Sequence, residues 1–221
     1  MRASLFLLIF LMSFSSNPEI NAEFPDPDPK RFTEEIKYFE TLDSKNSFPI
    51  NSFLFVGSSS IKYWKTAQAF PSKQVINRGF GGSDLSDVNY FYHKIVKPYS
   101  AKKIFLYAGD NDIARGKTVD QVFKDYKEFV MRVQLDFPET KIVFIAIKPS
   151  KKRWDKWPRM KIVNNMIRDY SQSQNKLEYA DLSTSLINSD GNLKDVFIED
   201  GLHLNQFGYS LWQKSLDSYL N

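Results

Sequence analysis

Five short apolar runs, separated by segments of helical pattern, constrain the fold of this chain more than any other feature. They lie at residues 53–57, 75–79, 103–107, 141–147 and 177–182. Runs of this length and composition are typical of strands that are buried on both faces. Their alternation with helices predicts an α/β protein whose parallel sheet is covered by helices on both sides.

The segments between the runs carry apolar residues at helical spacing. Two of them begin with a capping signal: Ser83 is a good N-cap for the first, and Thr118 with Gln121 forms a capping box at the start of the second. His93 lies off the apolar stripe of the first helix, so we expect it at the surface. The expected helices cover residues 85–95, 119–133, 160–170 and 209–220.

Residues 1–22 have the layout of a secretory signal peptide. Arg2 gives a positive start, an apolar run covers residues 5–12, and Ala22 ends the small and polar stretch that follows. The run is well below the roughly 20 residues that a membrane-spanning helix needs. A buried N-terminal helix is the alternative, and Pro18 disfavours it. We therefore expect cleavage after Ala22, a secreted or periplasmic protein, and no stable insertion in a membrane after cleavage.

The rest of the chain is expected to form one folded domain over residues 49–221, preceded by a linker and helix over residues 23–48. Alternate prolines in residues 23–30 favour an extended linker. The absence of cysteine from the 221 residues excludes a cysteine nucleophile and a thiolate metal site. The two histidines, His93 and His203, are too few for a three-histidine zinc site. The formal net charge of +4 comes with scattered lysines, so no nucleic-acid partner is expected.

Polar, glycine-containing segments follow three of the predicted strands. They are GSSS at 57–60, GFGGSD at 79–84 and GDND at 109–112, and Asp200 and His203 lie near the C-terminus. In a parallel sheet such segments gather at the carboxyl ends of the strands. Together they supply a hydroxyl, an Asp–His pair and several amide donors. These are the parts of an acyl-transfer site: a nucleophile, a base, a group that orients the base, and donors for an oxyanion.

Two other ligand classes fit these segments poorly. A dinucleotide-binding loop needs a third glycine where Asp84 stands, and that carboxylate would repel a pyrophosphate. Residues 110–112 could supply oxygen ligands to calcium, but the glycine and the terminal glutamate of an EF-hand loop are missing.

The four polar segments resemble the sequence blocks of the SGNH (GDSL-type) hydrolases, a superfamily of esterases and lipases. Residues 55–59 resemble the first block, 79–82 the second, 109–112 the third and 200–203 the last. In the first block, Ser58 stands where the family usually has aspartate. The nucleophile could therefore be Ser58, Ser59 or Ser60, and the spacing after Gly57 favours Ser59.

The resemblance implies a flavodoxin-like, three-layer α/β/α sandwich with a five-stranded parallel sheet. It also implies that Ser59 attacks an ester, that His203 is the base, and that Asp200 orients the imidazole. The backbone N–H groups of Ser59 and Gly82, with the side-chain amide of Asn111, would bind the oxyanion. Neither a metal nor an organic cofactor is implied.

The expected function is the hydrolysis of carboxylic esters through an acyl-enzyme. No long apolar lid is visible, which favours short acyl or acetyl esters on a small molecule or a carbohydrate. A non-catalytic, carbohydrate-binding relative with the same fold is the alternative. The segment 148–150 follows the fourth strand and is expected to shape the pocket. Trp154 and Trp157 could stack on sugar or acyl groups or could simply cover the domain.

Overall fold

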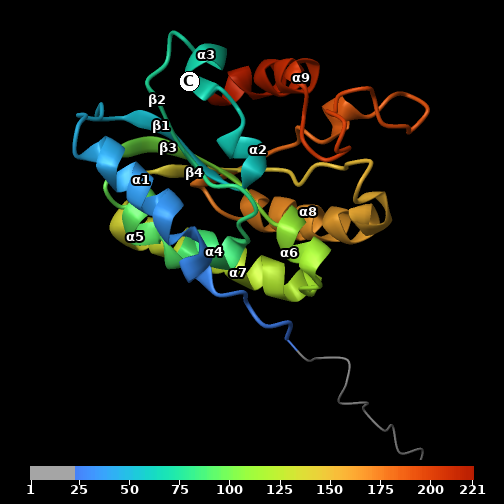
Figure 1. Cartoon of the computed structure of the whole chain (residues 1–221), viewed down its shortest axis with the longest axis horizontal. Coiled ribbons are helices and arrows are strands. Elements are labelled where there is room, and N and C mark those ends of the chain that lie inside the picture. Colours follow the sequence, from blue (N-terminus) through green and yellow to red (C-terminus); the bar gives the residue numbers. More distant parts are fainter. Residues whose placement is uncertain (1–22) are drawn as a thin grey trace, which may run out of the picture.

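The computed structural model describes residues 23–221, which form a five-stranded sheet between two layers of helices (Figure 1). Neighbouring strands are all parallel, and their order is β2-β1-β3-β4-β5. This is the order of flavodoxin-like sheets, so the predicted three-layer α/β/α sandwich is confirmed. The strands are β1 (Ser52–Gly57), β2 (Val75–Gly79), β3 (Ala101–Tyr107), β4 (Lys141–Ile145) and β5 (Leu177–Ala180).

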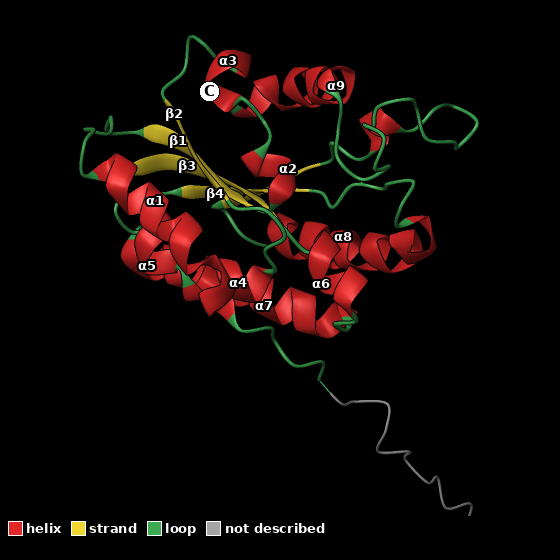
Figure 2. Cartoon of the chain, in the orientation of Figure 1, coloured by secondary structure: helices red, strands yellow, loops and turns green. Residues whose placement is uncertain are grey.

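Helices cover both faces of the sheet (Figure 2). One layer contains α1 (Thr33–Asp43), α4 (Leu85–Tyr90), α5 (Tyr92–Ile95), α6 (Asp110–Arg115), α7 (Val119–Asp136) and α8 (Trp157–Gln172). The other layer contains α2 (Ser59–Lys62), α3 (Thr66–Ala69) and α9 (Gln206–Leu216). The 3-10 turns are η2 (Pro29–Phe32), η3 (Trp154–Lys156), η4 (Thr184–Leu186) and η5 (Asp217–Tyr219).

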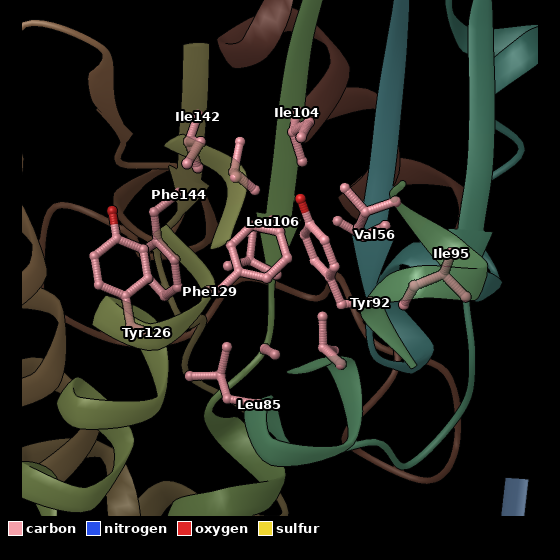
Figure 3. Packing of buried hydrophobic residues seen from close by; sticks show 14 of the residues in the cluster. Val56, Leu85, Tyr92, Ile95, Ile104, Leu106, Tyr126, Phe129, Ile142 and Phe144 are labelled. Atoms are coloured by element: carbon pink, nitrogen blue, oxygen red, sulfur yellow. The ribbon is translucent and has the colours of Figure 1, made fainter. Parts of the chain in front are cut away.

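Each strand contributes to two hydrophobic cores, because successive side chains point to opposite faces of a sheet. In β1, Leu54 and Val56 enter the larger core with α1, α4, α5, α7 and α8, whereas Phe53 and Phe55 enter the smaller core with Trp212 of α9. Figure 3 shows how Val56 and its neighbours on the sheet face the helix side chains of the larger core. Burial on both faces explains why the strands appear in the sequence as nearly continuous apolar runs.

Two strands end earlier than their apolar runs predict. β4 ends at Ile145 and not at Ile147, because the backbone of Ile147 pairs with a side chain instead of a strand. The N–H of Ile147 donates to Asn164 Oδ1 (2.8 Å), and Asn164 Nδ2 donates to the carbonyl of Ile147 (2.9 Å). β5 ends at Ala180, two residues before the run ends.

The N-cap of α4 is Asp84, so the expected capping role of Ser83 is wrong. The Ser83 hydroxyl turns back and donates to the carbonyl of Phe80 (3.0 Å). The N–H of Asp84 donates to Asp87 Oδ2 (2.8 Å), which fixes the first turn of the helix. The helical pattern expected over 85–95 is divided at Phe91 into α4 and α5.

Residues 23–32, here called the N-terminal arm, lie against α4, α7 and the turn between α6 and α7. The N–H of Phe24 donates to Gln121 Oε1 (3.1 Å), and Gln121 Nε2 donates to the carbonyl of Phe24 (2.9 Å). Asp26 pairs with Lys117 at 2.6 Å. The expected signal peptide, residues 1–22, lies outside the described residues, and the division of the chain at residue 48 stays a prediction. Within residues 23–221, no helix combines the length and the apolar character that crossing a bilayer requires.

Candidate active site

Ser59 begins α2, directly after the turn that follows β1. Gly57 in this turn has φ +135°, and a Cβ on it would lie 1.8 Å from the carbonyl oxygen of Tyr107. That oxygen accepts a hydrogen bond from the N–H of Ser58 (2.9 Å), which fixes the turn against β3. A residue with a side chain at position 57 would push the two strands apart. The tight turn therefore presents Ser59 at the carboxyl edge of the sheet.

His203 links Ser59 to Asp200. Its Nε2 lies 2.9 Å from Ser59 Oγ, and its Nδ1 lies 2.5 Å from Asp200 Oδ2. The other carboxylate oxygen, Asp200 Oδ1, accepts from the backbone N–H groups of Leu202 (2.8 Å) and His203 (2.9 Å). These two bonds close the turn, which explains how an aspartate only three residues before the histidine can reach its ring. The structure therefore brings the three predicted residues together.

Asp200 is held in its ionised form. Burial alone would raise the pKa of this carboxyl, but the hydrogen bonds from the N–H groups of His203 and Leu202 and from the His203 ring outweigh it and lower the pKa to about 2. An ionised carboxylate at Nδ1 fixes which ring nitrogen carries the proton and leaves Nε2 free to accept one. The arrangement therefore equips His203 to act as a base toward Ser59.

Three N–H donors lie at the same carboxyl edge of the sheet as Ser59. Among residues 23–221, the backbone N–H groups of Ser59 and Gly82 have no acceptor. Gly82 has φ +82°, and a Cβ built on it would meet nothing within 4 Å, so open space lies above this backbone. Asn111 Nδ2 donates one of its two protons to the carbonyl of Ser83 (2.9 Å). The predicted oxyanion donors thus lie in adjoining segments.

Asp112 and Arg115 hold the glycine loop against α6. Asp112 Oδ1 accepts from the N–H of Leu85 (3.0 Å), and Arg115 Nη2 donates to the carbonyl of Gly82 (2.9 Å). Asp112 also pairs with Lys117 (3.2 Å). Burial raises the pKa of Asp112, while Lys117 opposes the rise. Asn111 is therefore not the one residue of the block 109–112 with a role at the site, because Asp112, the last residue of the block, fixes the loop that carries Gly82.

Arg153 contacts the site and was not among the predicted residues. Its Nη2 donates to Asn111 Oδ1 (2.8 Å), and its Nη1 donates to Asp110 Oδ2 (2.8 Å). Arg153 comes from the segment after β4, where residues 148–150 were expected to shape the pocket and Trp154 to stack on a ligand or to cover the domain. Lys148 is buried there, which lowers its pKa to about 8, and it donates to the carbonyl of Leu202 (2.7 Å). Position after a strand was the one sequence signal for Arg153.

The remaining candidates lie apart from His203. Of the three serines in the first block, Ser59 alone has its hydroxyl within hydrogen-bonding distance of the imidazole within residues 23–221. His93 is exposed on α5, as predicted. Trp157 is part of the larger core, whereas Trp154 is 45% exposed. Both tryptophans line a separate pocket of about 430 Å³ beside α8.

Comparison with known proteins identifies the family. The sequence profile of the family described as "GDSL-like Lipase/Acylhydrolase family" matches residues 61–211, more than half of the chain. The chain belongs to this family. It is a carboxylic ester hydrolase with the SGNH fold. The match includes Gly82, Asn111, Asp200 and His203, and it begins two residues after Ser59.

Relatives of this GDSL-like hydrolase cover most of its length. Platelet-activating factor acetylhydrolase IB subunit alpha1 of Bos taurus is 23% identical over 186 residues, which cover 80% of this chain and 78% of the relative. A candidate platelet activating factor from Streptococcus pneumoniae superposes with TM-score 0.78 at 25% identity, over 86% of this chain and 94% of the other. An acetyl-xylooligosaccharide esterase variant from Geobacillus superposes with TM-score 0.65 at 12% identity, over 79% and 96% of the two chains.

Proposed function

We propose that the protein is a serine esterase in which Ser59 Oγ attacks the carbonyl carbon of an ester. His203 Nε2 accepts the hydroxyl proton as the new bond forms, and Asp200 stabilises the imidazolium. The intermediate then expels the alcohol, which takes its proton from Nε2, and an acyl-enzyme remains on Ser59. Water, activated by the same imidazole, releases the acid and restores the serine. The observation that carries this proposal is the continuous contact from Ser59 through His203 to Asp200.

The negative charge of each tetrahedral intermediate is stabilised by the N–H groups of Ser59 and Gly82 and by the amide of Asn111. The N–H groups of Ser59 and Gly82 have no acceptor within residues 23–221, and Asn111 Nδ2 uses one of its two protons, which supports this role because a free donor costs no rearrangement when the oxyanion forms. Loss of one such donor costs about 100- to 1,000-fold in turnover. Asn111→Ala should therefore reduce kcat by about this factor.

Labelling with a fluorophosphonate tests the nucleophile. We expect one phosphonyl adduct, located by mass spectrometry on Ser59, and none on a Ser59→Ala protein. Ser185→Ala is a matched control with the same substitution at a serine outside the site, and it should label fully. An adduct on Ser58 or Ser60 would overturn the assignment. No adduct, together with no ester hydrolysis, would instead favour the alternative of a carbohydrate-binding protein without catalysis.

We infer that the acyl group is short, in the simplest case acetyl, on a small alcohol or a carbohydrate. Two similar proteins support this inference, because one is named an acetylhydrolase and the other an esterase of acetylated xylo-oligosaccharides. Activity on p-nitrophenyl acetate should exceed that on the decanoate at least about tenfold. A preference for the longer chain would exclude the inference.

We also propose that the protein is secreted or periplasmic, on the signal-peptide pattern of residues 1–22. Sequencing of the mature N-terminus should give Glu23 as the first residue. An intact N-terminus on protein recovered from the cytoplasm would contradict this.

A further inference from the structure

A pocket of about 670 Å³ opens beside His203. Its walls are formed by the segment from Tyr63 to Ala69 and by the first turns of α9. The ring of Tyr63 stands edge-on to the imidazole, with a centroid distance of 5.0 Å and an angle of 85°. His203 is therefore part of the pocket wall, and a group bound in the pocket would lie next to the proposed base.

The chemistry of the proposed reaction determines which half of an ester could occupy this pocket. The departing alcohol oxygen receives its proton from His203 Nε2, so the alcohol must lie on the imidazole side of Ser59. The oxyanion points instead to the N–H groups of Ser59 and Gly82. A pocket walled by His203 is therefore placed for the alcohol half of the substrate.

The lining of the pocket combines aromatic rings with side-chain amides. Tyr63, Trp64 and Tyr209 supply the rings, and the stacked pair Trp64 and Tyr209 has a centroid distance of 5.8 Å. Gln68 and Gln206 line the pocket and are exposed, and within residues 23–221 their amides have no hydrogen-bond partner in the protein. The lining is mostly apolar, which suits either an alkyl chain or the C–H face of a sugar ring, whereas a phosphate would require a cluster of cations. The exposed amides of Gln68 and Gln206 favour the sugar, because its hydroxyl groups can exchange hydrogen bonds with them and an alkyl chain cannot.

We propose that this pocket binds the alcohol half of the ester and that this alcohol is a sugar. The proposal rests on the proposed serine-esterase function. In it, Gln68 and Gln206 exchange hydrogen bonds with sugar hydroxyls, and the exposed ring of Tyr63 contacts the apolar face of the sugar ring.

The test compares acetylated xylobiose with ethyl acetate, whose alcohol is too small to fill the pocket. In a Gln68→Ala/Gln206→Ala protein, the ratio of kcat/KM for the sugar ester to kcat/KM for ethyl acetate should fall about tenfold, since each lost hydrogen bond weakens binding severalfold. Gln172→Ala/Gln174→Ala removes two exposed amides from the end of α8 and its following turn, and it should leave the ratio unchanged. An unchanged ratio in the first variant would overturn the proposal.

Binding without hydrolysis separates this proposal from the catalytic one. Xylobiose should give saturation-transfer NMR signals with the Ser59→Ala protein, and the Gln68→Ala/Gln206→Ala substitutions should weaken them. If xylobiose does not bind, the sugar pocket is wrong even where the esterase is active. If Ser59→Ala still hydrolyses ethyl acetate, the proposed nucleophile is wrong, whatever xylobiose does.

A different observation carries a second inference, which also rests on the proposed function. We infer that Arg153 is a positioning residue for the Asn111 amide. Its guanidinium binds Asn111 Oδ1, so the amide cannot rotate without breaking this bond and the one from Nδ2 to the carbonyl of Ser83. The cation also draws electron density from the amide oxygen, which makes the remaining N–H a stronger donor.

Kinetics on ethyl acetate tests this role. Arg153→Gln should lower kcat about tenfold with KM unchanged, and Arg153→Lys, which keeps a cation beside Asp110, should lower it nearly as much. In an Asn111→Ala protein, neither substitution should cause a further loss, because the amide is already absent. Arg168→Gln, an exposed arginine on α8, is the control. If the double variant lost as much kcat as the two single variants combined, Arg153 would act independently of Asn111, and the inference would be overturned.

Discussion

The turn before Ser59 depends on a single glycine. Gly57 combines a positive φ with the closest approach of any glycine to a neighbouring backbone, since its Cβ would lie 1.8 Å from the oxygen of Tyr107. Gly191 shares the positive φ (+83°), but nothing lies within 4 Å of its Cβ position. The two glycines therefore separate the cost of the backbone conformation from the cost of a steric clash.

Gly57→Ala should destabilise the protein by several kcal/mol more than Gly191→Ala, which should lose about 1–2 kcal/mol. The physical reason is that β1 and β3 must separate to admit the new methyl group. Urea unfolding followed by circular dichroism measures both values. Equal losses for the two variants would contradict the steric explanation.

Asp87 gives the fold a dependence on pH. Burial raises the pKa of this carboxyl to about 6 from the ordinary 3.8, although the N–H of Asp84 and the Arg31 guanidinium lower it. Between these two values the folded protein holds a proton that the unfolded chain has released. Raising the pH from about 4 to about 6 therefore reduces the free energy of unfolding.

The contribution of Asp87 to this fall is on the order of 1–3 kcal/mol. The Asp87→Asn protein lacks this titrating carboxyl. Between about pH 4 and pH 6 its free energy of unfolding should therefore fall less than that of the unsubstituted protein, and the difference should be about 1–3 kcal/mol. Urea titrations at several pH values between 4 and 7 give the comparison. Parallel curves for the two proteins would show that the folded carboxyl keeps its ordinary pKa.

At the scale of elements, the start of a helix can be predicted from the sequence where the side chains that cap it lie within a few residues of each other. Thr118 and Gln121 form the predicted capping box of α7: the N–H of Gln121 donates to Thr118 Oγ1 (3.1 Å), and the N–H of Thr118 donates to Gln121 Oε1 (2.9 Å). The predicted cap at Ser83 is wrong because the next residue, Asp84, is an equally good capping residue, and the long-range hydrogen bond that the N–H of Leu85 donates to Asp112 fixes the helix start.

Thr118→Ala should destabilise the protein by about 1 kcal/mol, which is the usual worth of an N-cap side chain. Thr118→Ser retains the hydroxyl and should lose much less. Thermal melts of the three proteins decide the point. A serine variant as unstable as the alanine variant would mean that the methyl group of Thr118, and not its hydroxyl, stabilises the start of α7.

Over the whole molecule, the sheet and the residues at its carboxyl edge could be predicted because both leave short-range patterns. Buried strands appear as apolar runs, and Ser59, Asn111 and His203 belong to short motifs with recognisable spacing. Arg153 could not be predicted, because its contacts with Asp110 and Asn111 span 43 and 42 residues, respectively, and leave no periodicity. The contacts of the N-terminal arm are of the same kind, since a proline-rich segment in the sequence indicates only an extended backbone.

The N-terminal arm should stabilise the domain against unfolding. It supplies Arg31 to the buried Asp87 and Asp26 to the buried Lys117, and Phe32 is part of the larger core. A chain that begins at Thr33 should therefore melt at least about 5 °C below one that begins at Glu23. Glu23→Gln, which removes only an exposed pair with Lys124, should melt unchanged. An unchanged melting temperature in the shortened chain would show that the arm's contacts contribute no stability.

Ser59 and His203 are separated by 144 residues, and among the described residues α9 is the one long helix that follows His203. During translation the serine leaves the ribosome long before its imidazole has been made. Under the proposed mechanism, a nascent polypeptide therefore cannot hydrolyse esters before residue 203 has been synthesised. A product truncated upstream of codon 203 should be inactive, however much of the sheet it retains.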